Sequence, residues 1–144
     1  MDTTGPSLSN KDFTYFSVAR DISLLSDHRC QMGCVIVDHH RIIGSGHNSM
    51  TKCHPVQLDL DNKFYPETID KNKGPLHAEV SALLPLIKRH YDLSGATLYI
   101  YRKDKHGTLA MSRPCVRCMS LLKKYGIKKI KYTTPDGFAF EKII

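Results

Sequence analysis

The sequence predicts an α/β protein of three layers, in which helices cover both faces of a five-stranded mixed sheet. Short apolar runs rich in β-branched residues alternate along the chain with longer segments whose apolar residues recur at helical spacing. Their order is helix, two strands, helix, strand, helix and two strands, and helices between strands favour a mixed sheet covered on both sides. A length of 144 residues fits one domain, which we expect over residues 9–144.

The first helix is predicted from Ser9 to about Ser26. Ser9 is a suitable N-cap, and Asp12 gives the first turn an acidic residue. Residues 1–8 are expected to form a flexible or loosely packed N-terminal tail. The apolar face of the helix consists of Phe13, Phe16, Val18, Ile22, Leu24 and Leu25.

A β-hairpin is predicted next, with strands at residues 32–37 and 41–46 and a polar turn at 38–40. The segment 49–75 then runs for 27 residues with three prolines and little periodicity. Loops of that length in a compact domain are usually functional or disordered. We expect this loop to act as a lid that influences which substrate binds.

The second helix is predicted over residues 76–90, with a bend at Pro85, because proline removes one backbone hydrogen bond. A strand is expected at 97–101. Pro114 can open a third helix that ends at Gly126. The last two strands, 127–133 and 138–143, are separated by a short turn, which predicts an antiparallel hairpin.

Composition indicates an ordinary globular protein, with 41% hydrophobic and 24% charged residues. No apolar run approaches the roughly 20 residues that a membrane helix requires, and the first residues lack the pattern of a signal peptide. We therefore expect a cytoplasmic protein with no membrane partner. The five cysteines are an odd number, and two form a CxxC after a proline, which favours metal binding over disulfides.

Positive charge is concentrated in the last third of the chain. Residues 1–101 contain ten Lys/Arg and eleven Asp/Glu, whereas residues 102–144 contain eleven and three. Such a field attracts a nucleotide phosphate or a nucleic-acid backbone. A solvated, lysine-rich surface explains the charge equally well.

Four side chains carry the chemistry that the sequence predicts. His77 lies at the start of the second predicted helix, and Cys115 and Cys118 lie at the start of the third. One imidazole and two thiolates can hold a Zn²⁺ ion and leave its fourth position open to water, as catalytic zinc sites do. Glu79 is then a carboxylate that is not a ligand and can move the protons of that water, which makes it the predicted catalytic residue.

A second, structural zinc ion is possible but not favoured. Its ligands would come from His28, Cys30, Cys53 and His54. Small buried cysteines are the commoner alternative. Cys34 stands where an apolar strand residue is expected, so we assign it to the core.

His77-Ala78-Glu79 together with Pro114-Cys115-Val116-Arg117-Cys118 resembles the zinc-dependent cytidine and deoxycytidylate deaminase superfamily, whose motif is H-x-E…P-C-x-x-C. The likeness runs from about residue 31 to residue 142 and includes the hairpin. It is strongest to small single-domain deaminases of the deoxycytidylate type, including those of phages and large DNA viruses. The resemblance implies a cytidine-deaminase-like fold and a hydrolase that releases ammonia from a nucleobase, with Glu79 as proton shuttle.

The resemblance also implies substrate contacts. Asn48 would hydrogen-bond the sugar, and the backbone N–H of Ala78 would hold the pyrimidine carbonyl. The backbone around Ser112 and Arg113 would accept from the amine, and Tyr132 would line the base pocket. For Asn48 an alternative is open, a turn residue that stabilises the strand end.

A free cytosine nucleotide or nucleoside is the expected substrate, with dCMP favoured because the basic C-terminal third suits a phosphate. Lys52, His54 or Arg113 would meet that phosphate. The alternative is a base-editing deaminase that acts on cytosine or adenine in RNA or single-stranded DNA. The short connection between the last two strands resembles the free-nucleoside and antibiotic deaminases, since nucleic-acid editors and deoxycytidylate deaminases usually insert a helix there. A non-catalytic zinc module is a third reading, which Glu79 disfavours. The family resemblance further suggests a homo-oligomer.

Overall fold

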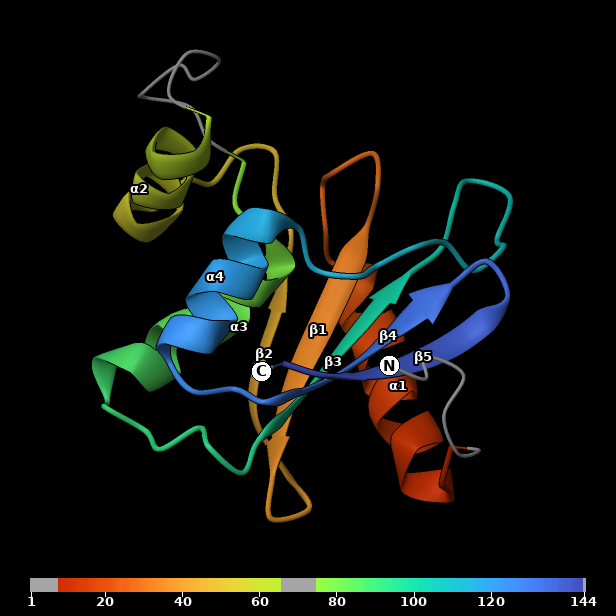
Figure 1. Cartoon of the computed structure of the whole chain (residues 1–144). Helices are drawn as coiled ribbons and strands as arrows, with labels where there is room; N and C mark the ends of the chain where they lie inside the picture. Colours follow the sequence, from red (N-terminus) through yellow and green to blue (C-terminus); the bar gives the residue numbers. More distant parts are fainter. Residues whose placement is uncertain (1–7, 66–74, 144) are drawn as a thin grey trace.

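The computed structural model describes residues 8–65 and 75–143 (Figure 1), which contain four helices and five strands. In chain order these are α1 (Asn10–Ser23), β1 (Met32–Asp38), β2 (Arg41–His47), α2 (Pro55–Phe64), α3 (Ala78–Lys88), β3 (Thr97–Arg102), α4 (Val116–Lys124), β4 (Lys129–Thr134) and β5 (Gly137–Lys142). The predicted N-terminal tail, apart from residue 8, lies outside the described residues.

The strands form one five-stranded mixed sheet, as predicted, and their order is β2-β1-β3-β4-β5. Only the β3–β4 pair of this sheet is parallel among the described strands, and β4 and β5 form the expected antiparallel hairpin. The β1–β2 turn places His39 and His40 at φ of 51° and 62°. Two-residue hairpin turns of the favoured type need positive φ at both central positions, so this turn continues the twist of the sheet.

Helices cover both faces of the sheet, which confirms the three-layer prediction. In Figure 1, α1 lies behind the sheet, while α3 and α4 lie on the other side. Successive β1 residues alternate between the two cores: Val35 packs with Phe16 of α1, and Ile36 packs with Leu83 of α3. Cys34 is fully buried on the α3 side, as expected for a core residue.

The structure corrects the prediction that residues 49–75 form one structureless loop, because α2 occupies Pro55–Phe64. Pro55, which favoured a loop reading, stands at the start of the helix, where its fixed φ suits the helical conformation. The ring of His54 accepts a hydrogen bond from the Val56 N–H and caps this end. Residues 66–74 of the predicted lid lie outside the described residues.

The helix α3 begins two residues later than predicted, and His77 is its N-cap. Pro85 is inside the helix, which continues to Lys88. Within residues 8–65 and 75–143, none of the helices is both long enough and apolar enough to cross a membrane.

A close approach of backbones fastens α3 to β2. A Cβ added at Gly46 would lie 2.5 Å from the Ala82 nitrogen and 2.7 Å from the Ala78 carbonyl oxygen. We expect Gly46→Ala to lower the free energy of unfolding by about 1–3 kcal/mol, because rigid backbone must shift to admit the methyl group. Urea denaturation measures this change.

Gly95→Ala is the matched control for that prediction. Its added Cβ would come within 3.4 Å of Asp38 Oδ1, an ordinary contact. Equal stabilities of the two variants would contradict the proposed close approach of α3 to β2.

Candidate active site

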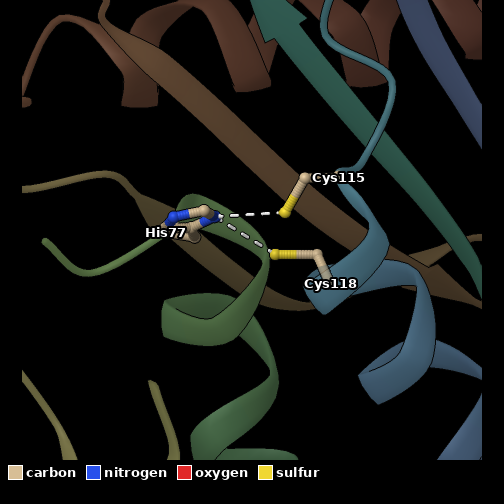
Figure 2. Close-up of side chains that lie close together, drawn as sticks. All are labelled: His77, Cys115 and Cys118. Atoms are coloured by element: carbon tan, nitrogen blue, oxygen red, sulfur yellow. Dashed lines mark hydrogen bonds between the residues drawn. The ribbon is translucent and has the colours of Figure 1, made fainter. Parts of the chain in front are cut away.

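Two helix starts bring three metal-binding side chains together on one side of the sheet. His77 is the N-cap of α3, Cys115 is the N-cap of α4, and Cys118 lies in the first turn of α4. Figure 2 shows the imidazole of His77 facing both sulfur atoms. Neither N-cap side chain makes a capping hydrogen bond to its own helix. Both remain available to bind a metal ion.

The spacing of the donor atoms fits a zinc ion. His77 Nδ1 lies 3.3 Å from Cys118 Sγ and 3.8 Å from Cys115 Sγ, and the ligand atoms all fall within 4.8 Å of one another. Nitrogen and sulfur ligands of a tetrahedral zinc ion stand roughly 3.6 Å apart, given bond lengths of about 2.1 and 2.3 Å. The donor set, one imidazole and two thiols, is also one that zinc prefers.

The two thiols differ in acidity. Hydrogen bonds from Cys118 and His77 lower the pKa of Cys115 to about 3, despite its partial burial. The neighbouring Cys115 sulfur and deep burial raise the pKa of Cys118. Burial lowers the pKa of His77, but the hydrogen bond to Cys115 and the charge of Glu79 leave it raised. The cluster thus holds a thiolate next to a protonated thiol, and metal binding displaces such a proton.

Glu79 is almost completely buried, with 3% of its surface exposed, in the first turn of α3. Burial raises the pKa of Glu79, while the nearby His77 opposes that rise. In the described part of the chain, the metal-binding cluster contains His77, Cys115 and Cys118, and Glu79 stands outside it. A buried carboxyl group with a raised pKa is suited to hold and release a proton.

A cavity of about 390 Å³ opens beside the cluster. Four of the predicted site residues besides the ligands line it: Asn48, Ala78, Glu79 and Arg113. Three basic side chains that were not predicted to contact the substrate also line it: His28, Arg102 and Arg117. The cavity is large enough for a small organic molecule.

Asn48 combines a place in the cavity wall with a structural task. Its Oδ1 accepts hydrogen bonds from the Met32 N–H at 2.9 Å and the Ser26 hydroxyl at 2.6 Å. Its Nδ2 donates to the Cys30 carbonyl at 2.7 Å. These bonds match the alternative reading of Asn48 as a residue that stabilises the strand end, although a side-chain amide carries a second N–H.

The other three residues that were predicted to contact the substrate differ in their surroundings. Ser112 is buried, and its hydroxyl donates to the Ile100 carbonyl at 3.1 Å. Arg113 reaches the cavity and also makes two hydrogen bonds to Glu141, at 2.7 and 2.8 Å. Tyr132 is buried, donates to Glu141 at 3.0 Å, and is not among the described residues that line the cavity.

Two other groups of predicted residues do not assemble into sites. Among the described residues, no second metal-binding cluster forms from the side chains considered for a structural ion. His28 accepts a hydrogen bond from the Cys30 N–H, and His54 caps α2. The cavity wall, as far as the structure describes it, includes neither Lys52 nor His54.

A polar chain from α2 reaches the metal-binding cluster, and the sequence analysis missed it. The Gln57 Oε1 atom accepts from the His77 N–H at 3.1 Å, and Gln57 Nε2 donates to Asp61 Oδ1 at 2.9 Å. Arg117 Nη1 donates to the same Asp61 oxygen at 2.7 Å. The only sequence signal was the spacing of Gln57 and Asp61, four residues apart, which places them on one face of a helix.

Comparison with known families gives a match over most of the chain. The family described as "Cytidine and deoxycytidylate deaminase zinc-binding region" matches residues 9–134. No curated protein shows significant sequence similarity to the chain.

Solved structures share the fold. The dCMP deaminase from the cyanophage S-TIM5 in apo form is 22% identical, over 88% of this chain and 84% of that one, with a TM-score of 0.61. The same phage enzyme in complex with dCMP and dUMP gives 22% identity, coverages of 88% and 83%, and a TM-score of 0.60. A cytidine deaminase from Burkholderia pseudomallei is 11% identical over 94% of both chains, with a TM-score of 0.62.

Proposed function

Because the chain belongs to the cytidine and deoxycytidylate deaminase family, we propose that it deaminates a free cytosine nucleotide or nucleoside to the uracil product, with dCMP the favoured substrate. Membership makes the protein a zinc-dependent hydrolase with one Zn²⁺ ion. The observation that carries the proposal is the cluster of His77, Cys115 and Cys118 beside buried Glu79 in the wall of one cavity. One nitrogen and two sulfur ligands beside a buried carboxyl group are suited to zinc-dependent hydrolysis.

The three clustered side chains are the proposed zinc ligands. Zinc held by three protein ligands supplies an open position for water and lowers the pKa of that water. The chain contributes the surroundings of this water. Glu79, next to the ligands, would move the two protons of the water. One would go to the ring nitrogen as the oxygen adds to the amine-bearing carbon, and the other to the amine, which leaves as ammonia when its bond to that carbon breaks.

We propose that groups at or near the cavity wall orient the substrate. The backbone N–H of Ala78, at the N-terminus of α3, would hold the carbonyl oxygen of a pyrimidine, because the first N–H groups of a helix lack partners within it. Asn48 offers its second amide N–H to the sugar. Backbone carbonyls around Ser112 and Arg113 would accept from the exocyclic amine.

For the phosphate of a nucleotide, the structure favours Arg102 over the residues first considered. Arg102 lines the cavity and donates to the Met111 carbonyl at 3.2 Å and to Cys30 Sγ at 3.5 Å, while its buried Nε has no hydrogen-bond partner among the described residues. Arg113 is already paired with Glu141. An incompletely paired guanidinium in a cavity is a ready ligand for an anionic oxygen. The phage relative solved with dCMP and dUMP is consistent with a nucleotide substrate.

Ammonia release from a set of compounds tests the proposed function. The set is cytidine, dCMP, dCTP, adenosine and short single-stranded oligonucleotides. We expect turnover of the free cytosine compounds, fastest with dCMP. Reaction with the oligonucleotides alone would refute the proposal.

Arg102→Met tests the role of the guanidinium. We expect KM for dCMP to rise by roughly 10–100-fold and KM for cytidine to change little, because one charge-assisted hydrogen bond contributes about 1.5–3 kcal/mol. Arg20→Met, at an exposed ion pair on α1, is the control for an arginine lost elsewhere. Equal losses on dCMP and cytidine would show that Arg102 does not recognise the phosphate.

The alternative, an enzyme that edits RNA or single-stranded DNA, rests on the basic C-terminal third. Part of that charge is engaged inside the protein: Lys131 pairs with Asp12, Arg113 with Glu141, and Arg117 with Asp61. These pairs weaken the case for a continuous backbone-binding surface. Homo-oligomerisation stays a prediction of family resemblance.

A further inference from the structure

The helix α2 contributes to the metal site through side chains, although it holds none of the three proposed zinc ligands. We propose that Gln57, Asp61 and Arg117 are positioning residues, which hold the starts of α3 and α4 at the separation that the zinc ligands need. The inference rests on the proposed function only for the identity of the metal site.

The first link is between Gln57 and His77. Gln57 has no exposed surface, and its Oε1 accepts from the His77 backbone N–H at 3.1 Å. The imidazole of His77 points toward the two sulfur atoms (Figure 2) and makes no capping bond. The His77 side chain makes no bond that would hold the His77 backbone in place. The buried side-chain amide of Gln57, from α2, holds it instead. Partners of this kind orient metal ligands and raise metal affinity.

The second link is between Asp61 and Arg117. Arg117 lies between Cys115 and Cys118 in the first turn of α4, and its Nη1 lies 2.7 Å from Asp61 Oδ1. The Asp61 side chain is only 5% exposed. The Arg117 guanidinium also lies 5.0 Å from the centre of the Tyr65 ring, at the end of α2. The segment that carries both thiols is therefore held from α2 at two places.

One oxygen atom joins the two links. Asp61 Oδ1 accepts both from Gln57 Nε2 at 2.9 Å and from Arg117 Nη1 at 2.7 Å. The path from the His77 backbone to the CxxC segment thus consists of three hydrogen bonds through buried groups. Loss of Asp61 would leave Gln57 and Arg117 without this partner, and the cost of unpaired buried polar groups would drive both to new conformations.

A purely structural role for this chain of residues makes a different prediction. The helix α2 also packs Val56 and Leu60 against the core. If the polar residues only attach α2, their loss would lower stability and leave the intrinsic geometry and zinc affinity of the folded site unchanged. The proposal predicts that metal affinity changes in the folded protein.

Zinc affinity, measured by competition with a coloured chelator, separates these roles. We expect Asp61→Ala to weaken zinc binding by roughly 10–100-fold, the usual effect of losing a partner of a metal ligand. Asp61→Asn retains an acceptor oxygen and should recover most of the affinity. Asp59→Ala, the same change at an exposed position of α2, should bind zinc like the wild type.

Cobalt(II) in place of zinc reports the geometry of the site directly. Asp61→Ala and Gln57→Met should shift the visible absorption of the cobalt protein, and Asp59→Ala should not. If Asp61→Ala does not fold, Gln57→Met decides the question. Wild-type zinc affinity and an unchanged cobalt spectrum in folded Gln57→Met, or in folded Asp61→Ala, would overturn the proposal. Neither measurement needs a substrate, so failure to deaminate cytosine compounds would refute the proposed function and leave this test intact.

Discussion

Glu79→Gln is expected to retain one zinc ion per chain and to lower kcat for dCMP by roughly two to four orders of magnitude, the usual contribution of a proton-transferring group. Glutamine has the size and shape of glutamate but cannot exchange a proton. Because Glu79 is 3% exposed and lies beside the ligands without joining them, the substitution should alter proton transfer and leave the metal in place. Metal analysis and ammonia release measure the two quantities on one sample.

Asp21→Asn is the matched control, since it neutralises an exposed carboxylate on α1 across the sheet. It should leave both quantities unchanged. Retained turnover in Glu79→Gln would remove the shuttle role. Loss of zinc would instead indicate that Glu79 is itself a ligand.

Cys115→Ala is expected to release the zinc ion and to lower the melting temperature to that of the chelator-treated wild type. Metal that binds only the folded state stabilises it by about 4 kcal/mol when free zinc is a thousand times its Kd. For a protein of this size that corresponds to roughly 8–16 °C. Calorimetry of the variant and of the wild type, each with and without a chelator, measures the difference.

Two further cysteines provide controls for that prediction. Cys53 is exposed and Cys30 half-buried, and neither belongs to the metal-binding cluster of the described residues. Cys53→Ala and Cys30→Ala should each keep one zinc ion per chain. Loss of the ion from either variant would contradict the proposed ligand set.

Most of the fold could be predicted because its signals are local. In β1, Val35 and Ile36 face opposite cores, and a strand buried on both faces is a continuous apolar run. The capping box of Ser9 and Asp12 marks the start of α1 within four residues. The short β4–β5 connection determines an antiparallel pair.

The helix α2 was missed because its apolar stripe is short and lies in a segment with three prolines. Val56, Leu60 and Phe64 recur at helical spacing and pack on the core, but they are only three residues. Pro55 opens the helix, His54 caps it, and its buried face also includes two polar residues, Gln57 and Asp61. The helix is held by hydrogen bonds to His77 and Arg117, at the starts of α3 and α4, which are distant in sequence.

The metal-binding residues were predictable, whereas the residues that line the cavity were only partly so. His77, Cys115 and Cys118 follow from residue type, spacing and helix starts. The place of Arg102 in the cavity depends on the strand end from which it extends. The bond from Tyr132 to Glu141 depends on the register of β4 and β5, in which Tyr132 lies opposite Ala139 and diagonal to Glu141. Neither property is visible in the order of the residues alone.

X-ray absorption at the zinc edge of the purified protein tests the central claim most directly. The account predicts one zinc ion per chain, bound by two sulfur atoms at about 2.3 Å and by two lighter atoms at about 2.0–2.1 Å, one from an imidazole and one from water. A shell of three or four sulfur atoms, or of two imidazoles with two sulfur atoms, would close the coordination sphere with protein ligands. That result would contradict a catalytic zinc at His77, Cys115 and Cys118.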